Sequence, residues 1–248
     1  MKTEDKKIAV IGIGGVGGYV AGMLAKAYPQ VTMVARGARA ESIREKGLVL
    51  HSDYKGEIVA KPERVVPVRE MGHQDYIFIC VKNYSLAEVC ESIRDMVTED
   101  TVIIPVMNGV DPGEKIRALI KKGTVVDSLI YTVAFANSDF SISQQDTFTW
   151  LCIGIKDANE KQQEKVREVA EILKGADIDY RDEGDIQVEI WRKYILNCAF
   201  NVMTAFYDNT IGELRKDPVK AEQYERLVWE AASVGRAKGV ALTDEHIN

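Results

Sequence analysis

The chain has few of the residues that build disulfide frameworks and metal centres. Its 248 residues include four cysteines, none of them in a C-x-x-C pair, and three histidines. Cysteines so few and so scattered argue against a disulfide framework or a zinc site and favour a reducing compartment. We therefore expect a cytoplasmic protein without a histidine-rich metal site.

An excess of positive charge is also lacking. The formal net charge is −6, and charged residues make up 28% and hydrophobic residues 46% of the chain. The acidic balance argues against a general nucleic-acid binder, and the composition argues against a disordered or fibrous protein. The length suffices for one large domain or two modest ones with a real core.

Charge is absent from residues 8–25, a run of 18 that just reaches the length of a membrane-spanning helix. Six of these 18 residues are glycine, however. That glycine content favours a short buried strand, a glycine turn and a helix over a signal peptide or a membrane span. We therefore expect no association with a membrane.

The order of the elements predicts an α/β fold with a Rossmann-like parallel sheet. A β-branched run over 7–11, a glycine turn, helical spacing from Val16 to Ala27 and a strand over 31–35 form a βαβ unit. Strands and helices then continue to alternate, with strands over 76–81, 102–106, 125–134 and 149–155 and helices over 86–97, from 111 onward and over 166–173. Such alternation implies a mostly parallel sheet covered on both faces.

The pattern changes near Gly184. Residues 186–206 and 218–238 both have helical spacing, and no strand pattern lies between them. We therefore predict a dinucleotide-binding α/β domain over residues 1–184 and an all-helical domain over residues 185–248.

A glycine-rich motif lies between the first strand and the first helix. It reads G-x-G-x-x-G and consists of Gly12, Ile13, Gly14, Gly15, Val16 and Gly17. In such motifs the first glycine permits a tight turn, the second lets the backbone approach a pyrophosphate, and the third lets the helix pack on the strand. The strand–turn–helix context predicts a dinucleotide site, and the other interpretation is a turn kept for packing alone.

The end of the second strand indicates which dinucleotide binds. An NAD site typically has an acidic residue there, which binds the ribose hydroxyls. This chain instead has Arg36, with Arg39 close by and no acidic residue before Glu41. An arginine can pair with a 2′-phosphate and stack on adenine, so we favour NADP over NAD. The alternative is that Arg36 is a solvated surface residue.

A polar stripe runs along the first helix of the helical domain. Lys193, Asn197 and Asn201 are spaced i, i+4, i+8 among apolar residues, so they share one helix face. A solvated face would carry more charge, so we predict a cleft with positioned donors. In a ketone reduction, a nearby ammonium can stabilise the charge that develops on the carbonyl oxygen and supply the proton. The alternative is a surface pair of Glu189 with Lys193 and incidental asparagines.

Two further polar residues follow predicted strands. Lys82 comes directly after the strand over 76–81, and Asn108-Gly109 follows the strand over 102–106. Both would lie at the carboxyl edge of the sheet, where open α/β sheets bind ligands. Each is weak evidence alone, because lysine is an ordinary loop residue and Asn-Gly an ordinary turn.

Taken together, these pieces resemble the ketopantoate reductases (2-dehydropantoate 2-reductases). The matching stretches run through nearly the whole chain, and the last of them is the specific one: Ile11-Gly12-x-Gly14-x-x-Gly17, Val34-Ala35-Arg36, Ile43-Arg44-x-x-Gly47-Leu48, Val81-Lys82, Asn108-Gly109, Ile153-Gly154 and Trp191-x-Lys193-x-x-x-Asn197-x-x-x-Asn201-x-x-Thr204-Ala205.

The resemblance implies NADPH-dependent reduction of 2-dehydropantoate to (R)-pantoate, a step toward pantothenate and coenzyme A. It also implies that Lys193 is the proton donor and that Asn197 and Asn201 bind the substrate hydroxyls. Lys82 and Asn108 would contact cofactor and substrate, and Arg36 the 2′-phosphate. The second domain would resemble the C-terminal domain of 6-phosphogluconate dehydrogenase. A homodimer is compatible with the sequence, which does not determine the oligomeric state.

The chain departs from the family at its end. Family members continue for some tens of residues into a Ser-rich segment and an Arg-x-Thr-Glu element, whose serine and glutamate serve substrate and cofactor. This chain stops at Asn248, before that segment, and Glu245 lies in the wrong context to replace the glutamate. We therefore expect a truncated helical domain, exposed apolar helix faces and poor catalysis. A reductase of another branched 2-keto acid and a non-catalytic NADPH-binding sensor remain as alternatives.

Overall fold

The structure is a computed structural model that describes residues 5–247. It contains two compact units, the first ending at Gly184 and the second beginning at Asp185. The first unit is built on two sheets, and the second is helical.

The first sheet confirms the Rossmann-like fold. Its order is β5-β2-β1-β6-β7-β8, and every neighbouring pair is parallel. The strands are β1 (Ile8–Ile11), β2 (Val31–Val34), β5 (Arg64–Val66), β6 (Tyr76–Ile79), β7 (Val102–Pro105) and β8 (Thr124–Val125). The carboxyl ends of β1, β2, β6 and β7 therefore lie along one edge, which is where the residues predicted to bind the cofactor follow.

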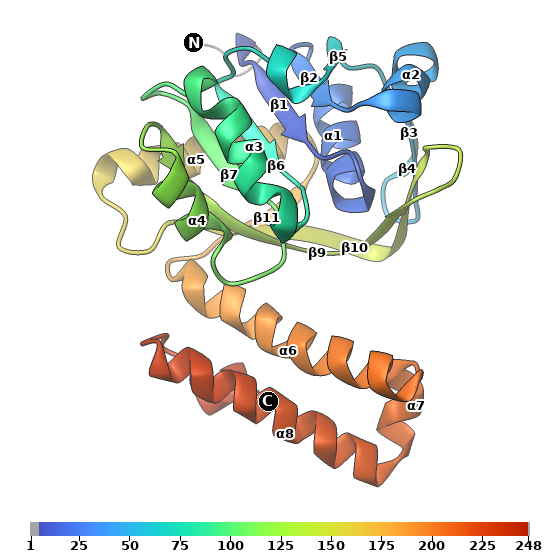
Figure 1. Ribbon diagram of the computed structural model, residues 1–248, viewed down its shortest axis with the longest axis vertical. Coiled ribbons are helices and arrows are strands. Elements are labelled where there is room, and N and C mark those ends of the chain that lie inside the picture. Colours follow the sequence, from blue (N-terminus) through green and yellow to red (C-terminus); the bar gives the residue numbers. More distant parts are fainter. Residues whose placement is uncertain (1–4, 248) are drawn as a thin grey trace. The chain divides into compact units, whose positions relative to one another are not determined.

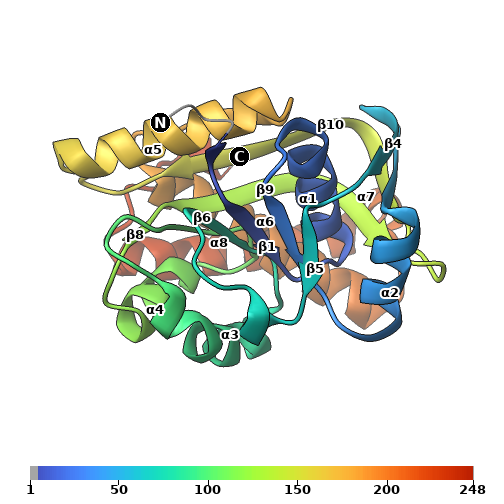
Figure 2. The same cartoon turned by 90° about the horizontal axis from the view of Figure 1, so that it is seen from above.

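Helices cover both faces of this sheet (Figures 1 and 2). The predicted helices are present as α1 (Gly15–Ala27), α3 (Leu86–Ile93), α4 (Pro112–Leu119) and α5 (Glu160–Gly175), and α2 (Gly37–Lys46) joins them. Ile8 and Val10 pack in one apolar cluster, with α1 and α5, while Ala9 and Ile11 pack in the other, with α3 and α4. Burial on both faces explains why these strands are continuous apolar runs.

The second sheet corrects the expectation that the strands over 125–134 and 149–155 belong to a mostly parallel sheet. They form β9 (Asp127–Ala136) and β10 (Ile142–Gly154), an antiparallel hairpin. β10 also pairs in parallel with β3 (Leu48–Ser52) and β11 (Asp179–Asp182), and β3 pairs antiparallel with β4 (Gly56–Ala60). Too few residues separate β9 from β10 for a crossover helix, so only a hairpin can join them.

Helix α1 lies between the two sheets. It contacts β1 and β2 of the first sheet and β3, β4, β9 and β10 of the second. Its residues Tyr19, Val20, Met23 and Leu24 are buried with no exposed surface. The start of α1, which carries the glycine motif, is thereby held by both sheets.

The second unit is a hairpin of two long helices. The predicted helices are α6 (Ile186–Tyr207) and α8 (Pro218–Ala237), and the short α7 (Ile211–Lys216) lies between them (Figure 1). The side chains of Asp185, Thr210 and Asp217 accept backbone N–H groups at the starts of α6, α7 and α8. Trp191 of α6 packs against Gly235 of α8, where a Cβ would lie 2.8 Å from the indole ring.

Within residues 5–247, no helix combines the length and the apolar character that crossing a membrane requires. The glycine-rich run that raised the question is split between β1, the turn and α1.

A partly buried hydrogen bond between the first sheet and α5 provides a test of the packing. The hydroxyl of Tyr76 donates to Glu168 Oε2 at 2.5 Å, and Lys165 Nζ lies 3.1 Å from the same oxygen. Burial acts to raise the pKa of Glu168, but the hydrogen bond from Tyr76 and the ammonium of Lys165 outweigh it and hold the pKa below its ordinary value of 4.5. Glu168 thus contributes stability above about pH 4.5 that is lost as the pH falls.

Tyr76→Phe is therefore expected to lower the free energy of unfolding at pH 7 by about 1.5 kcal/mol, the low end for hydrogen bonds to charged groups. The deficit should shrink below pH 4.5, where Glu168 is protonated in the unfolded chain. Urea unfolding at pH 7 and pH 4 measures both values. Tyr180→Phe is the control, because its hydroxyl makes no hydrogen bond to residues 5–247. An equal deficit at both pH values would contradict the role of Glu168.

Candidate functional site

The glycine loop turns sharply at the end of β1. Gly12 has φ +95°, a conformation that L side chains rarely adopt. A Cβ on Gly12 would also lie 2.8 Å from Val81 Cγ1 and 2.9 Å from the carbonyl oxygen of Cys80. The turn therefore needs glycine both for its backbone conformation and for the close approach of the chain that follows β6.

Two other glycines of the motif serve packing. A Cβ on Gly17 would lie 2.0 Å from the carbonyl oxygen of Gly12, and one on Gly15 would lie 2.2 Å from that of Ala134 in β9. Gly14 differs, because it is exposed and no atom lies within 4 Å of its Cβ position. The open space above Gly14 leaves its backbone accessible to a ligand.

The start of α1 fits an anionic group. α1 begins at Gly15, and its first turn, Gly15-Val16-Gly17, carries no acidic side chain. The first N–H groups of a helix have no partner within the helix and carry a partial positive charge. The side chain of Ile13 is buried, so the loop offers its backbone rather than side chains. These features fit the pyrophosphate of a dinucleotide.

Arg36 lies where the sequence places it, at the end of β2. It occupies the N-cap position of α2, and its side chain is exposed. Arg39 follows in the first turn of the same helix and is half-buried. The strand end thus presents two guanidinium groups and no carboxylate.

A hydrogen bond joins the loops that carry Lys82 and Asn108. Both residues are exposed, and the side chain of Asn83 donates from Nδ2 to the carbonyl oxygen of Asn108 at 2.9 Å. Asn83 was not among the predicted residues, although its position directly after Lys82 at a strand end was a usable signal.

Cys80 lies against the glycine loop, where its atoms meet the Cβ positions of Gly12 and Gly17. Burial raises the pKa of its thiol to about 12, so the thiol stays protonated.

Lys193, Asn197 and Asn201 lie on successive turns of α6. Lys193 and Asn197 are half-buried, and Asn201 is exposed. The buried side chains of α6 include Trp191, Ile195, Ala199 and Met203, which precede or follow the polar residues by two positions, and Trp191 packs against Gly235 of α8. Two positions correspond to about 200° around a helix, so the polar stripe lies on the face opposite these buried residues.

Apolar side chains border this stripe. Leu196 and Phe200 are 49% and 39% exposed, and Phe206 is 78% exposed at the end of α6. The expected combination of one ammonium, two carboxamides and apolar neighbours is therefore present on a single helix.

Both parts of the chain match one family. Residues 8–157 match the family described as ketopantoate reductase PanE/ApbA, and residues 185–248 match the ketopantoate reductase PanE/ApbA C-terminal family. The chain belongs to the ketopantoate reductase family. As a member, it is a pyridine-nucleotide-dependent oxidoreductase, and the predicted resemblance is confirmed.

Individual relatives agree with the family match. An uncharacterized oxidoreductase of Bacillus subtilis, YkpB, is 30% identical over 94% of this chain and 76% of its own length. A 2-dehydropantoate 2-reductase of Mesorhizobium japonicum is 27% identical over 94% of this chain and 77% of its own length. The crystal structure of 2-dehydropantoate 2-reductase from Porphyromonas gingivalis W83 superposes with a TM-score of 0.86, at 29% identity, over 98% of this chain and 85% of that chain.

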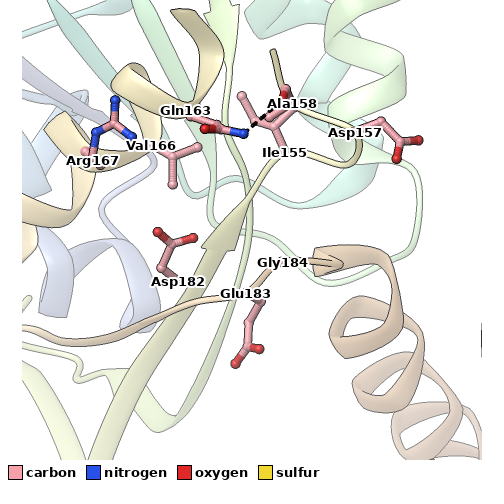
Figure 3. Close-up of a pocket in the computed structure, with 9 residues that line it drawn as sticks. All are labelled: Ile155, Asp157, Ala158, Gln163, Val166, Arg167, Asp182, Glu183 and Gly184. Atoms are coloured by element: carbon pink, nitrogen blue, oxygen red, sulfur yellow. Dashed lines mark hydrogen bonds between the residues drawn. The ribbon is translucent and has the colours of Figure 1, made fainter. Parts of the chain in front are cut away.

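A cavity of about 450 Å³ lies elsewhere in the first unit of this ketopantoate reductase family member (Figure 3). It opens at the carboxyl ends of β10 and β11, beside the start of α5, and its polar lining includes Asp157, Gln163, Arg167, Asp182 and Glu183. Gln163 Nε2 donates to the carbonyl oxygen of Ala158 at 3.1 Å across its rim. Its lining comes from α5 and from the ends of β10 and β11, whereas the glycine loop follows β1 of the first sheet, so we do not assign it to the dinucleotide.

Proposed function

We propose that the protein reduces 2-dehydropantoate to (R)-pantoate with NADPH, a step toward pantothenate and coenzyme A. The observation that carries the proposal is the stripe of Lys193, Asn197 and Asn201 on one face of α6, opposite the buried residues of that helix. Family membership supports the reaction class, and the stripe supplies the donors that a keto acid with a hydroxyl group needs.

The first unit holds the cofactor in this proposal. The backbone from Gly12 to Gly17 and the start of α1 bind the pyrophosphate, because Gly14 is open and no acid lies in the first turn. Arg36 binds the ribose 2′-phosphate through its guanidinium, and Lys82 and Asn108 bind along the same strand edge. Bound NADPH supplies the hydride for the reduction.

Lys193 supplies the proton. Negative charge develops on the carbonyl oxygen of the keto acid as it is reduced, and the Nζ ammonium of Lys193 stabilises that charge and donates a proton to the oxygen. Asn197 and Asn201 lie one turn and two turns further along α6. Each carboxamide can donate and accept hydrogen bonds, so the two residues orient the substrate hydroxyl group without adding charge. The exposed apolar side chains of Leu196 and Phe200 border this face and offer a bound substrate apolar surface to cover.

An assay of NADPH oxidation with 2-dehydropantoate tests the proposal. The enzyme is used in excess over NADPH, so that even slow single turnovers are recorded by absorbance. A panel of branched 2-keto acids that lack the hydroxyl group or carry longer side chains is run in parallel. Faster reduction of another keto acid would identify that acid, rather than 2-dehydropantoate, as the substrate. NADPH binding without turnover of any keto acid would favour a sensor.

A homodimer stays a prediction, and sedimentation of the purified chain measures the oligomeric state.

Arg36→Ala is expected to weaken NADPH binding by about 1–3 kcal/mol, the range for a charge-assisted contact, and to leave NADH binding nearly unchanged. The reason is that the two cofactors differ only in the 2′-phosphate, which the Arg36 guanidinium binds in this proposal. Titration calorimetry with both cofactors measures the difference. Arg69→Ala, an exposed arginine on the 3₁₀ turn over Val68–Glu70, removes the same charge and serves as the control. Equal weakening of both cofactors would remove the basis for choosing NADPH.

A further inference from the structure

Arg39 has an unusual environment in the first turn of α2. Its guanidinium lies over the ring of Phe140, with Cζ 5.1 Å from the ring centroid. Its Nη1 atom is buried and has no hydrogen-bond partner among residues 5–247. A guanidinium carries five N–H donors and cannot lose its charge, so a buried nitrogen without a partner is unfavourable unless a ligand satisfies it.

Phe140 is held in place for this contact. It has φ +71°, which a bulky side chain adopts only when its surroundings impose it. The turn between β9 and β10 imposes it through several bonds: Phe140 N–H donates to the carbonyl oxygen of Asn137 at 3.1 Å, and Ser141 donates from N and Oγ to Asp139 Oδ1 at 3.0 and 2.7 Å. Asn137 Nδ2 adds donations to Ser141 Oγ and Ser143 Oγ, both at 2.9 Å. The ring is thus a fixed platform under the Arg39 guanidinium.

The same hairpin borders the glycine loop. The Cβ positions of Gly15 and Gly18 meet Ala134 of β9 and Ile142 of β10, on the two strands that flank the Phe140 turn. Arg36 and Arg39 are three residues apart at the start of α2, a spacing that places side chains on one face. One hairpin therefore contacts both the glycine loop and Arg39.

We propose that Arg39 is a second phosphate-binding residue of the cofactor site, and that Phe140 is the positioning residue that holds its guanidinium for the ribose 2′-phosphate. The inference rests on the proposed use of NADPH and adds two determinants of cofactor choice, Arg39 on the same helix as Arg36 and Phe140 on a separate hairpin. A planar guanidinium stacked on an aromatic ring keeps its in-plane N–H groups available for a phosphate. The stack removes the need to order a flexible side chain when the nucleotide binds.

Nucleotide fragments test the role of Arg39. Adenosine 2′,5′-bisphosphate carries the 2′-phosphate, and adenosine 5′-monophosphate lacks it, so calorimetry with both separates the phosphate from the rest of the nucleotide. Arg39→Gln is expected to weaken the bisphosphate about tenfold, the scale of one hydrogen bond to a charged group, and the monophosphate less than about twofold. Unchanged bisphosphate binding, or equal weakening of both ligands, would overturn the inference.

Phe140 variants test the positioning. Phe140→Tyr keeps the aromatic platform and should keep the preference for the bisphosphate, whereas Phe140→Leu should lose part of it. In the Arg39→Gln background, Phe140→Leu should cause no further loss, because the guanidinium that it positions is absent. If Phe140→Leu lowers the bisphosphate affinity equally with and without Arg39, the ring acts on the fold and the positioning role is wrong.

The outcome for NADPH separates this inference from the proposed function. Wild-type protein that prefers NADPH, loses that preference in Arg36→Ala and keeps it in Arg39→Gln retains the proposed function and overturns only the inference. Wild-type protein that binds NADPH no better than NADH overturns the choice of NADPH and, with it, the inference.

Discussion

Replacing Lys193 by alanine is expected to slow the reduction of 2-dehydropantoate by about 10²–10⁴-fold, the range for loss of a positioned general acid. The ammonium is the only cationic member of the stripe, and Asn197 and Asn201 have no proton acidic enough to replace it. NADPH affinity should stay within about twofold, because the proposed pyrophosphate and phosphate contacts lie on α1 and α2.

Single-turnover absorbance with both proteins measures this effect. Lys216→Ala removes an exposed lysine from α7 and is the matched control. A Lys193→Ala protein that turns over at the wild-type rate would remove Lys193 from the mechanism, and NADPH binding would show whether the variant is folded.

Replacing Gly14 by alanine is expected to weaken NADPH binding about tenfold or more while the protein stays folded. The methyl group would enter the open space above Gly14, where the proposal places the pyrophosphate. Overpacking by one such group costs about 1–3 kcal/mol. The fold should tolerate it, because no atom lies within 4 Å of that position and Gly14 has an extended backbone, φ −95°. As Gly14 is the N-cap of α1, the stability cost should be below about 1 kcal/mol.

Two neighbouring glycines make this result specific. Gly22→Ala lies in the middle of α1 with ordinary contacts of 3.5 Å, so it should raise stability by about 0.5–1 kcal/mol and leave NADPH binding unchanged. Gly17→Ala would place its Cβ 2.0 Å from the Gly12 carbonyl oxygen and should destabilise the whole unit. Calorimetry and thermal unfolding of the three variants separate binding from folding. Normal NADPH affinity in Gly14→Ala would place the pyrophosphate elsewhere.

The elements that the sequence predicted well are those whose signal is local. The turn at Gly12, the helix from Gly15 and the strand over Val31–Val34 are adjacent in the chain, and each has its own periodicity. The long helices α6 and α8 also carry their own spacing, so residue spacing alone suffices to place the three residues of the polar stripe on one helix face.

The second sheet and two contacts of the candidate site depend on pairs of residues far apart in the chain. β10 pairs with β3 on one side and with β11 on the other, and the sequence of a single strand does not indicate which strands it pairs with. The bond from Asn83 to the Asn108 carbonyl oxygen and the stack of Arg39 on Phe140 likewise join segments that only folding brings together.

The amino-acid order by itself therefore determined the βαβ start, the helical second part and the residue types offered to a cofactor and a keto acid, because backbone period and side-chain chemistry are properties of short stretches. Tertiary structure decided which glycine is open to a ligand, which arginine is held against an aromatic ring and which strands share a sheet. Those features arise from close packing between distant segments, where fractions of an ångström separate a permitted contact from a clash.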